Sequence, residues 1–268
     1  MGGRRQLAVV VGAALIMCCA ATTAPAAPAA VHLRAAFDRD ARLGGTSAIS
    51  LDLRVFARRA PSPMTELTVL APRGIDFGTS GLGLATCQPA ARDLLTVLAR
   101  GHDLRSCPAN AVLGRGNATA AIHYSPQQTV AADGTVTLYN GPPVGDAPGV
   151  VAYVLTAHPI RSQLVYTGEL FQATAPFGLG IRLGLPAIPD SPFGAPISLG
   201  HLKFDLGGED VVYFELNKQG RRVRYHPGGL AIPANCPRGG FRFRATVRFA
   251  DGSARSGGTA TPCPPARR

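Results

Sequence analysis

Apolar and polar residues alternate strictly in two segments of the chain. At positions 49–55 the apolar residues occupy every second position and are separated by serine, aspartate and arginine. Positions 241–249 alternate in the same way, with arginine or threonine at the polar positions. Because successive side chains of a β-strand point to opposite faces, both segments predict strands with one face buried and one face in water.

Shorter apolar and β-branched runs predict further strands. They lie at residues 31–37, 66–70, 118–124, 136–139, 150–156, 163–171, 179–185, 199–206, 211–216 and 221–225. Asp133-Gly134 and Asp251-Gly252 predict hairpin turns, because glycine accepts the positive φ that such turns require. Asn140-Gly141 predicts a longer loop, since two prolines follow it.

One segment has helical spacing instead. Residues 89–100 place Leu94, Leu95 and Leu98 on one side of a helix, and Gly101 follows as a stop signal. Cys87 and Cys107 bracket this segment. We therefore expect a short helix whose leucines pack into the core.

The fold class predicted from these elements is mainly β: an antiparallel β-sandwich with one short disulfide-bracketed helix. The many short strands and the 23 prolines favour this class. We expect residues 31–268 to form a single β-rich domain. The Gly/Pro-rich stretch 176–200 is interpreted either as a long loop or as a seam between two subdomains.

The N-terminus has the three-part pattern of a secretory signal peptide. Arg4 and Arg5 precede an apolar run at 7–20, and two Ala-Pro-Ala triplets follow it. We expect residues 1–30 to be this signal, with an uncleaved membrane anchor as the alternative. No later segment is long and apolar enough to span a bilayer. The prediction is a secreted or extracellular protein, associated with the cell envelope or free of it.

Four cysteines remain beyond the signal: Cys87, Cys107, Cys236 and Cys263. An even number in an exported chain predicts disulfides, and four cysteines allow three connectivities. We predict Cys87–Cys107 and Cys236–Cys263, because each pair is local and encloses its own structural unit. Each bond would contribute about 3 kcal/mol. The chain has neither a C-x-x-C pair nor clustered histidines, so we expect no metal site and no cofactor.

Positive charge is the main candidate for a function. The formal net charge is +11, while only 16% of residues are charged and 46% are hydrophobic, which excludes a disordered polyelectrolyte. Six arginines fall in two strand candidates: Arg221, Arg222, Arg224, Arg242, Arg244 and Arg248. If these strands pair, their outer faces would form a stripe that binds an anionic envelope polymer or acidic headgroups. A solvated strand face is the alternative. Export and the lack of nucleic-acid-binding motifs argue against nucleic acid as the partner.

Catalytic motifs are weaker. The chain contains no nucleophile elbow and no H-E-x-x-H zinc motif. Glu169 and Glu215 are the carboxylate pair that could serve a glycosidase. Glu215, however, is expected to point to water, opposite Val212, Phe214 and Leu216. The chain has no Trp, so its composition gives sugar stacking no support.

The cysteine contexts resemble a known group of proteins. The sequence reads GLGLATC up to Cys87, CPANAVLGRGNATA from Cys107, and CPRGGFRFRATVRFADGS from Cys236, before TPCP around Cys263. This resembles uncharacterised secreted β-rich proteins of actinobacteria, and the resemblance covers roughly residues 65–263. It implies an exported β-rich fold and supports the two local disulfides, but it implies no activity. Gly114 and Gly116 are expected to let the chain turn into the strand that follows.

The sequence therefore predicts an exported, non-enzymatic β-sandwich that acts as an envelope or extracellular interaction module. The arginines named above would form its contact surface. The alternative is a secreted hydrolase that acts on glycans through Glu169 and Glu215.

Overall fold

The computed structural model describes residues 29–56, 62–77, 85–88, 107–125, 128–158, 162–185, 197–207, 213–225 and 229–266. The predicted signal, apart from its last two residues, and the predicted helix at 89–100 lie outside the described residues. A short 3-10 turn, η2, spans Ala109–Ala111. The strands are β1 (Ala30–Phe37), β2 (Thr46–Ser47), β3 (Ile49–Phe56), β4 (Met64–Pro72), β5 (Asp76–Phe77), β6 (Val112–His123), β7 (Thr129–Val144), β8 (Ala147–His158), β9 (Ser162–Gln172), β10 (Phe177–Gly184), β11 (Ile197–Leu206), β12 (Tyr213–Leu216), β13 (Arg222–Tyr225), β14 (Leu230–Ala231), β15 (Phe241–Phe249) and β16 (Ala254–Thr261).

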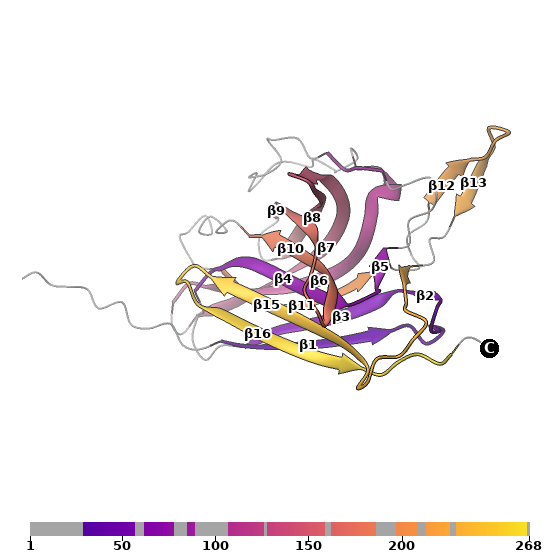
Figure 1. Cartoon of the computed structure of the whole chain (residues 1–268). Helices are drawn as coiled ribbons and strands as arrows, with labels where there is room; N and C mark the ends of the chain where they lie inside the picture. The colour runs from indigo at the N-terminus through magenta and orange to yellow at the C-terminus, as the bar shows by residue number, and fades with distance from the viewer. Residues whose placement is uncertain are drawn as a thin grey trace, which may run out of the picture.

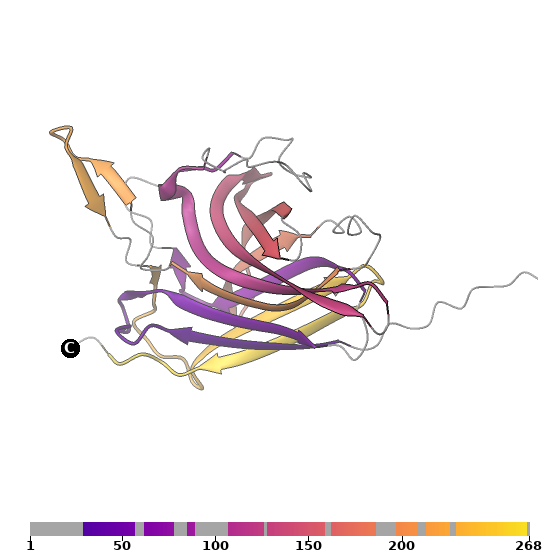
Figure 2. The same ribbon diagram turned by 180° about the vertical axis from the view of Figure 1, so that it is seen from behind.

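Eleven of the described strands form one sheet, in the order β1-β3-β11-β6-β7-β8-β9-β10-β4-β15-β16. All ten neighbouring pairs are antiparallel. β11 lies between β3 and β6, and β4 lies between β10 and β15, so segments distant in sequence become neighbours. The sheet curls strongly along β6 to β9 and brings its two ends together (Figures 1 and 2). The result is a nearly closed, barrel-like sheet.

The two edge strands meet at a seam, which we call the β1–β16 seam. Eleven strands of alternating direction leave β1 and β16 running the same way, so the seam is parallel. The hydroxyl of Thr261 donates a hydrogen bond of 2.7 Å to the carbonyl of Ala35. A Cβ atom at Gly257 would clash with the carbonyl oxygen of Val31. Backbone of one edge therefore packs directly on the other edge. This contact covers N–H and C=O groups that an open sheet edge would leave free to pair with another chain.

The interior of the sheet is the hydrophobic core. On β3 and β15 the alternating apolar side chains all point inward, as the burial patterns of both strands show. Ile49 and Phe241 are each 1% exposed, and Val247 is fully buried. Burial of each such side chain contributes about 1.5–3 kcal/mol. The same alternation leaves Arg242, Arg244 and Arg248 on the outside.

Gly114 and Gly116 have a role different from the one expected. Both lie inside β6, where they pair with β7 and β11. A Cβ atom on either glycine would come within 2.7 Å of the ring of Phe204, a buried residue of β11. The glycines therefore make room for this ring on the inner face of the sheet, and they do not turn the chain into the strand.

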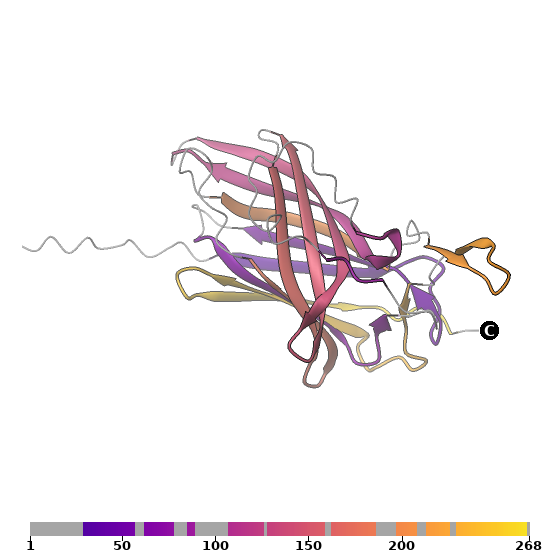
Figure 3. The same cartoon turned by 90° about the horizontal axis from the view of Figure 1, so that it is seen from above.

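Two smaller sheets lie beside the main one. β2, β14 and β5 form a three-stranded antiparallel sheet, which places the buried Leu230 of β14 against the core. β12 and β13 form a hairpin that pairs with no other described strand. This hairpin projects from the rest of the molecule in the views of Figures 1 and 3.

The mainly β, antiparallel prediction is confirmed, whereas a sandwich of two packed sheets is not confirmed, because one sheet contains eleven of the described strands.

The turn at Asp251-Gly252 is confirmed between β15 and β16, where Gly252 has a φ of 80°. Asp133-Gly134 was expected as a hairpin turn and Asn140-Gly141 as part of a longer loop, but both lie within β7. Because β7 pairs with a neighbour on each side, its ladders override these local turn signals. The chain turns instead at Gly145-Asp146.

Both predicted disulfides are confirmed. Cys87 and Cys107 lie at bonding distance with a Cα–Cα separation of 4.6 Å, and Cys236 and Cys263 with one of 5.8 Å. Cys87 is fully buried, and its N–H donates to the carbonyl of Asn140 in β7. The second disulfide ties the approach to β15 to the residues that follow β16.

Candidate functional site

A ladder of alternating charges crosses the outer face of four neighbouring strands, β9, β10, β4 and β15. Arg182 Nη1 lies 2.5 Å from Glu169 Oε1, and its Nε lies 4.0 Å from Glu66 Oε2. Arg248 Nε lies 3.3 Å from the other oxygen of Glu66. Two arginines thus face two carboxylates, and the ladder neutralises itself.

Two arginines on this face stack on aromatic rings. The guanidinium of Arg182 lies 4.6 Å from the ring centre of Phe171, and that of Arg244 lies 5.3 Å from the ring centre of Phe177. Phe177 reaches the outer face because the register of β10 against β4 shifts between Phe177 and Leu179. Leu179 lines the interior, so without that shift Phe177 would point inward too.

Arg242 and Arg244 are the exception to the charge pairing. Neither forms an ion pair with any carboxylate of the described residues. Both are exposed and share the outer face of β15, about 7 Å apart along the strand. Their partners on β16 are Ala260 and Gly258, whose small size leaves the guanidinium groups accessible. We call these two residues the β15 arginine pair.

The other predicted arginines are placed elsewhere. Arg221 precedes β13, and Arg222 and Arg224 lie on it. β13 pairs with β12, whereas β15 pairs with β4 and β16, so the stripe expected from pairing of these two segments does not form. Arg248 is on the predicted face, but Glu66 already neutralises it.

The structure does not bring Glu169 and Glu215 into one sheet. Glu169 lies on β9 and is held by Arg182, while Glu215 belongs to the β12–β13 hairpin. The carboxylate nearest to Glu169 in the ladder is Glu66, on the far side of Arg182. Arg182 lies between these two carboxylates and contacts both of them.

Two histidines form polar contacts that the sequence pattern did not reveal. His201 Nε2 lies 3.1 Å from Asp52 Oδ1, across the β3–β11 ladder. A hydrogen bond from Arg54 is the main cause that lowers the pKa of Asp52, and His201 adds to it. His123 Nε2 lies 2.9 Å from Ser198 Oγ, but its Nδ1 faces the hydroxyl of Thr129 rather than a carboxylate. No group of three potential metal ligands occurs among the described residues.

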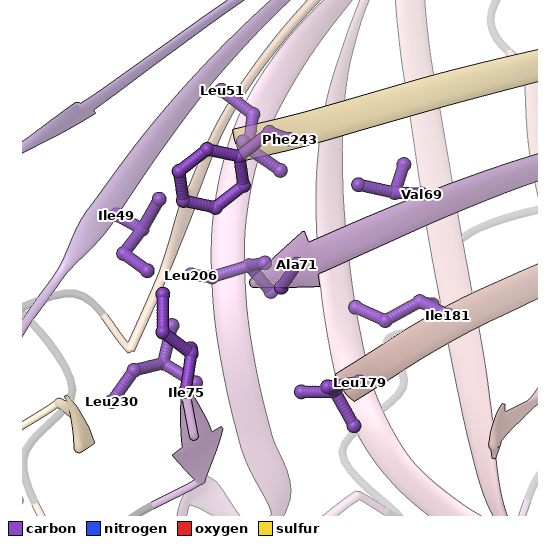
Figure 4. Close-up of a pocket in the computed structure, with 10 residues that line it drawn as sticks. All are labelled: Ile49, Leu51, Val69, Ala71, Ile75, Leu179, Ile181, Leu206, Leu230 and Phe243. Carbon is purple, nitrogen blue, oxygen red and sulfur yellow. The ribbon is translucent and has the colours of Figure 1, made fainter. Parts of the chain in front are cut away.

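A small apolar cavity lies inside the barrel-like sheet (Figure 4). About 20 Å³ of it is open to the centre of a water molecule. Its lining is entirely apolar and comes from five strands of the main sheet, with Ile75 and Leu230 at one end. A space that holds about one water molecule and has no polar wall cannot bind a polar ligand, and we assign it to core packing.

Comparison with models of protein families finds no match, and neither do comparisons with curated proteins and with solved structures. In the part of the chain that the structure describes, no helix is long and apolar enough to cross a membrane.

Proposed function

We propose that the chain is an exported, non-enzymatic β-rich protein that binds an anionic polymer of the cell envelope or extracellular space. The contact is the β15 arginine pair. One observation carries the proposal: Arg242 and Arg244 are exposed, share a face and have no carboxylate partner among the described residues, while the arginines of the adjacent ladder are neutralised.

The chemistry of the arginine pair suits anions. A guanidinium group carries a permanent charge and donates up to five hydrogen bonds in a planar fork that matches phosphate, sulfate or carboxylate. Stacking on Phe177 holds Arg244 in place before any ligand arrives. The pair and its small neighbours on β16 contain no group that exchanges a proton near pH 7, so the face supports binding rather than acid–base catalysis.

The sequence and the two disulfides support export. The two cysteine pairs are those expected in an oxidising compartment. The arginines, apolar run and small residues at the N-terminus support a signal peptide. The resemblance to secreted actinobacterial proteins supports a place outside the cell and implies no activity.

The test is retention on immobilised long-chain polyphosphate, measured over a series of salt concentrations. The double variant Arg242→Gln/Arg244→Gln should elute at lower salt than the wild type. If each arginine neutralises one charge of a flexible chain, the slope of log affinity against log salt falls by roughly 1.4.

The matched control is Arg54→Gln/Arg248→Gln, which removes the same formal charge from two arginines that already have carboxylate partners. This variant should retain most of the wild-type affinity. Equal losses in the two double variants would show that only net charge matters, and that result would overturn the proposal.

A further inference from the structure

The β12–β13 hairpin is a separate cationic element. Its two strands pair with each other from Tyr213–Tyr225 to Leu216–Arg222 and with no other described strand. The hairpin projects from the body of the molecule in two perpendicular views (Figures 1 and 3). A two-stranded hairpin is only marginally stable in water on its own, so a partner that covers it would also stabilise it.

The end of the hairpin is built as a defined turn. The side-chain oxygen of Asn217 accepts hydrogen bonds from the N–H groups of Gln219 and Arg221, at 3.0 and 2.9 Å. The N–H of Gly220 donates to the carbonyl of Asn217 at 2.8 Å, and Gly220 has a φ of 73°. This network holds the tip in one conformation and fixes the backbone positions of the cationic residues around it.

The charge at the tip has one sign. Residues 213–225 contain four basic residues and one acidic residue. Lys218, Arg221 and Arg222 are exposed. The next residue in the sequence, Val223, has an apolar side chain that is 46% exposed. Charge complementarity therefore requires an anionic partner, and the exposed valine favours one with an apolar layer beneath the charge.

We propose that the hairpin tip docks on an anionic lipid surface. A projecting hairpin can contact an extended surface while the body of the protein stays clear of it, whereas a polymer chain can lie along the outer face of β15. This docking is independent of the polymer-binding face proposed above.

The experiment is cosedimentation of the purified protein with vesicles. Vesicles that contain phosphatidylglycerol and phosphatidylcholine are compared with vesicles of phosphatidylcholine alone. The wild type should bind only the former. Each basic residue near such a surface contributes about fivefold to the partition coefficient, so Lys218→Gln/Arg221→Gln should lower it about 25-fold.

The control double variant Arg39→Gln/Lys203→Gln removes the same charge from exposed positions outside the hairpin and should bind vesicles like the wild type. Thermal unfolding checks that all variants fold. Equal binding to both vesicle types, no binding to either, or equal losses in the two double variants would each overturn the proposal. Binding to soluble polyphosphate that depends on Lys218 and Arg221, without vesicle binding, would reassign the hairpin to a polymer. The Arg242→Gln/Arg244→Gln variant should keep its vesicle binding, which separates this proposal from the first.

Discussion

The guanidinium of Arg244 lies 5.3 Å from the ring centre of Phe177, and no carboxylate of the described residues forms an ion pair with it. Arg182 stacks on Phe171 in the same manner, but Glu169 and Glu66 also hold it. The two stacks thus differ in one respect. Among the described residues, the Phe177 ring is the contact that orients Arg244. Arg182 is oriented by the Phe171 ring and also by two carboxylates.

Phe177→Leu should therefore weaken polyphosphate binding about threefold, although it changes no charge. The loss corresponds to roughly 0.5–1 kcal/mol for a cation–π contact of the exposed Arg244 guanidinium. Isothermal titration at constant salt measures it. Phe171→Leu is the control and should leave the affinity unchanged, because Glu169 and Glu66 still position Arg182. Unchanged binding in Phe177→Leu would mean that the stack does not orient the ligand-binding arginine.

The contact of Phe204 with β6 gives a prediction about stability. Gly116→Ala would place a methyl group within 2.7 Å of the Phe204 ring and against the backbone of Lys203. Overpacking of this kind costs about 1–3 kcal/mol, which denaturant titration would detect as a lower midpoint. Gly184→Ala on β10 is the control, because the nearest atom would be an ordinary 3.8 Å away. A neutral Gly116→Ala variant would show that the ring can move aside.

The β1–β16 seam gives a second stability prediction. Thr261→Val keeps the shape of the buried side chain but removes the hydrogen bond to Ala35, and leaves that carbonyl without its hydroxyl donor. The expected loss in the free energy of unfolding is about 1–2 kcal/mol. Thr246→Val removes a comparable bond to Ser256 on the exposed face and should cost much less. Equal losses would indicate that the seam is not a special point of closure.

Strand existence was predictable because alternation is a local property. β3 and β15 have one face in the core and one in water, so their sequences alone indicate both strands and the outward direction of Arg242 and Arg244. The two disulfides were predictable for a related reason, since each joins cysteines fewer than thirty residues apart.

The order of strands was not predictable, because it depends on contacts between distant segments. Nothing local in the sequence places β4 between β10 and β15, and this insertion is what creates the ladder of Glu66, Arg182 and Arg248. The register shift beside Gly178 is equally hidden, since Phe177, Leu179 and Ile181 form an unbroken alternating pattern in the sequence. The stacking partner of Arg244 therefore emerged only from the fold.

Tyr166 makes stability depend on pH in the alkaline range. The side chain is 8% exposed in the core, and burial raises its pKa from 10.0 to about 12. The folded state keeps the proton longer than the unfolded state, so the stabilisation is complete below pH 10 and is lost as the pH rises toward 12. The free energy of unfolding should fall by on the order of 2–3 kcal/mol over this interval because of Tyr166. Tyr166→Phe should remove that part of the decline in denaturant titrations, whereas Tyr124→Phe, at a 37% exposed position, should retain it. Identical pH profiles for Tyr166→Phe and the wild type would contradict burial of a neutral phenol inside the barrel-like sheet.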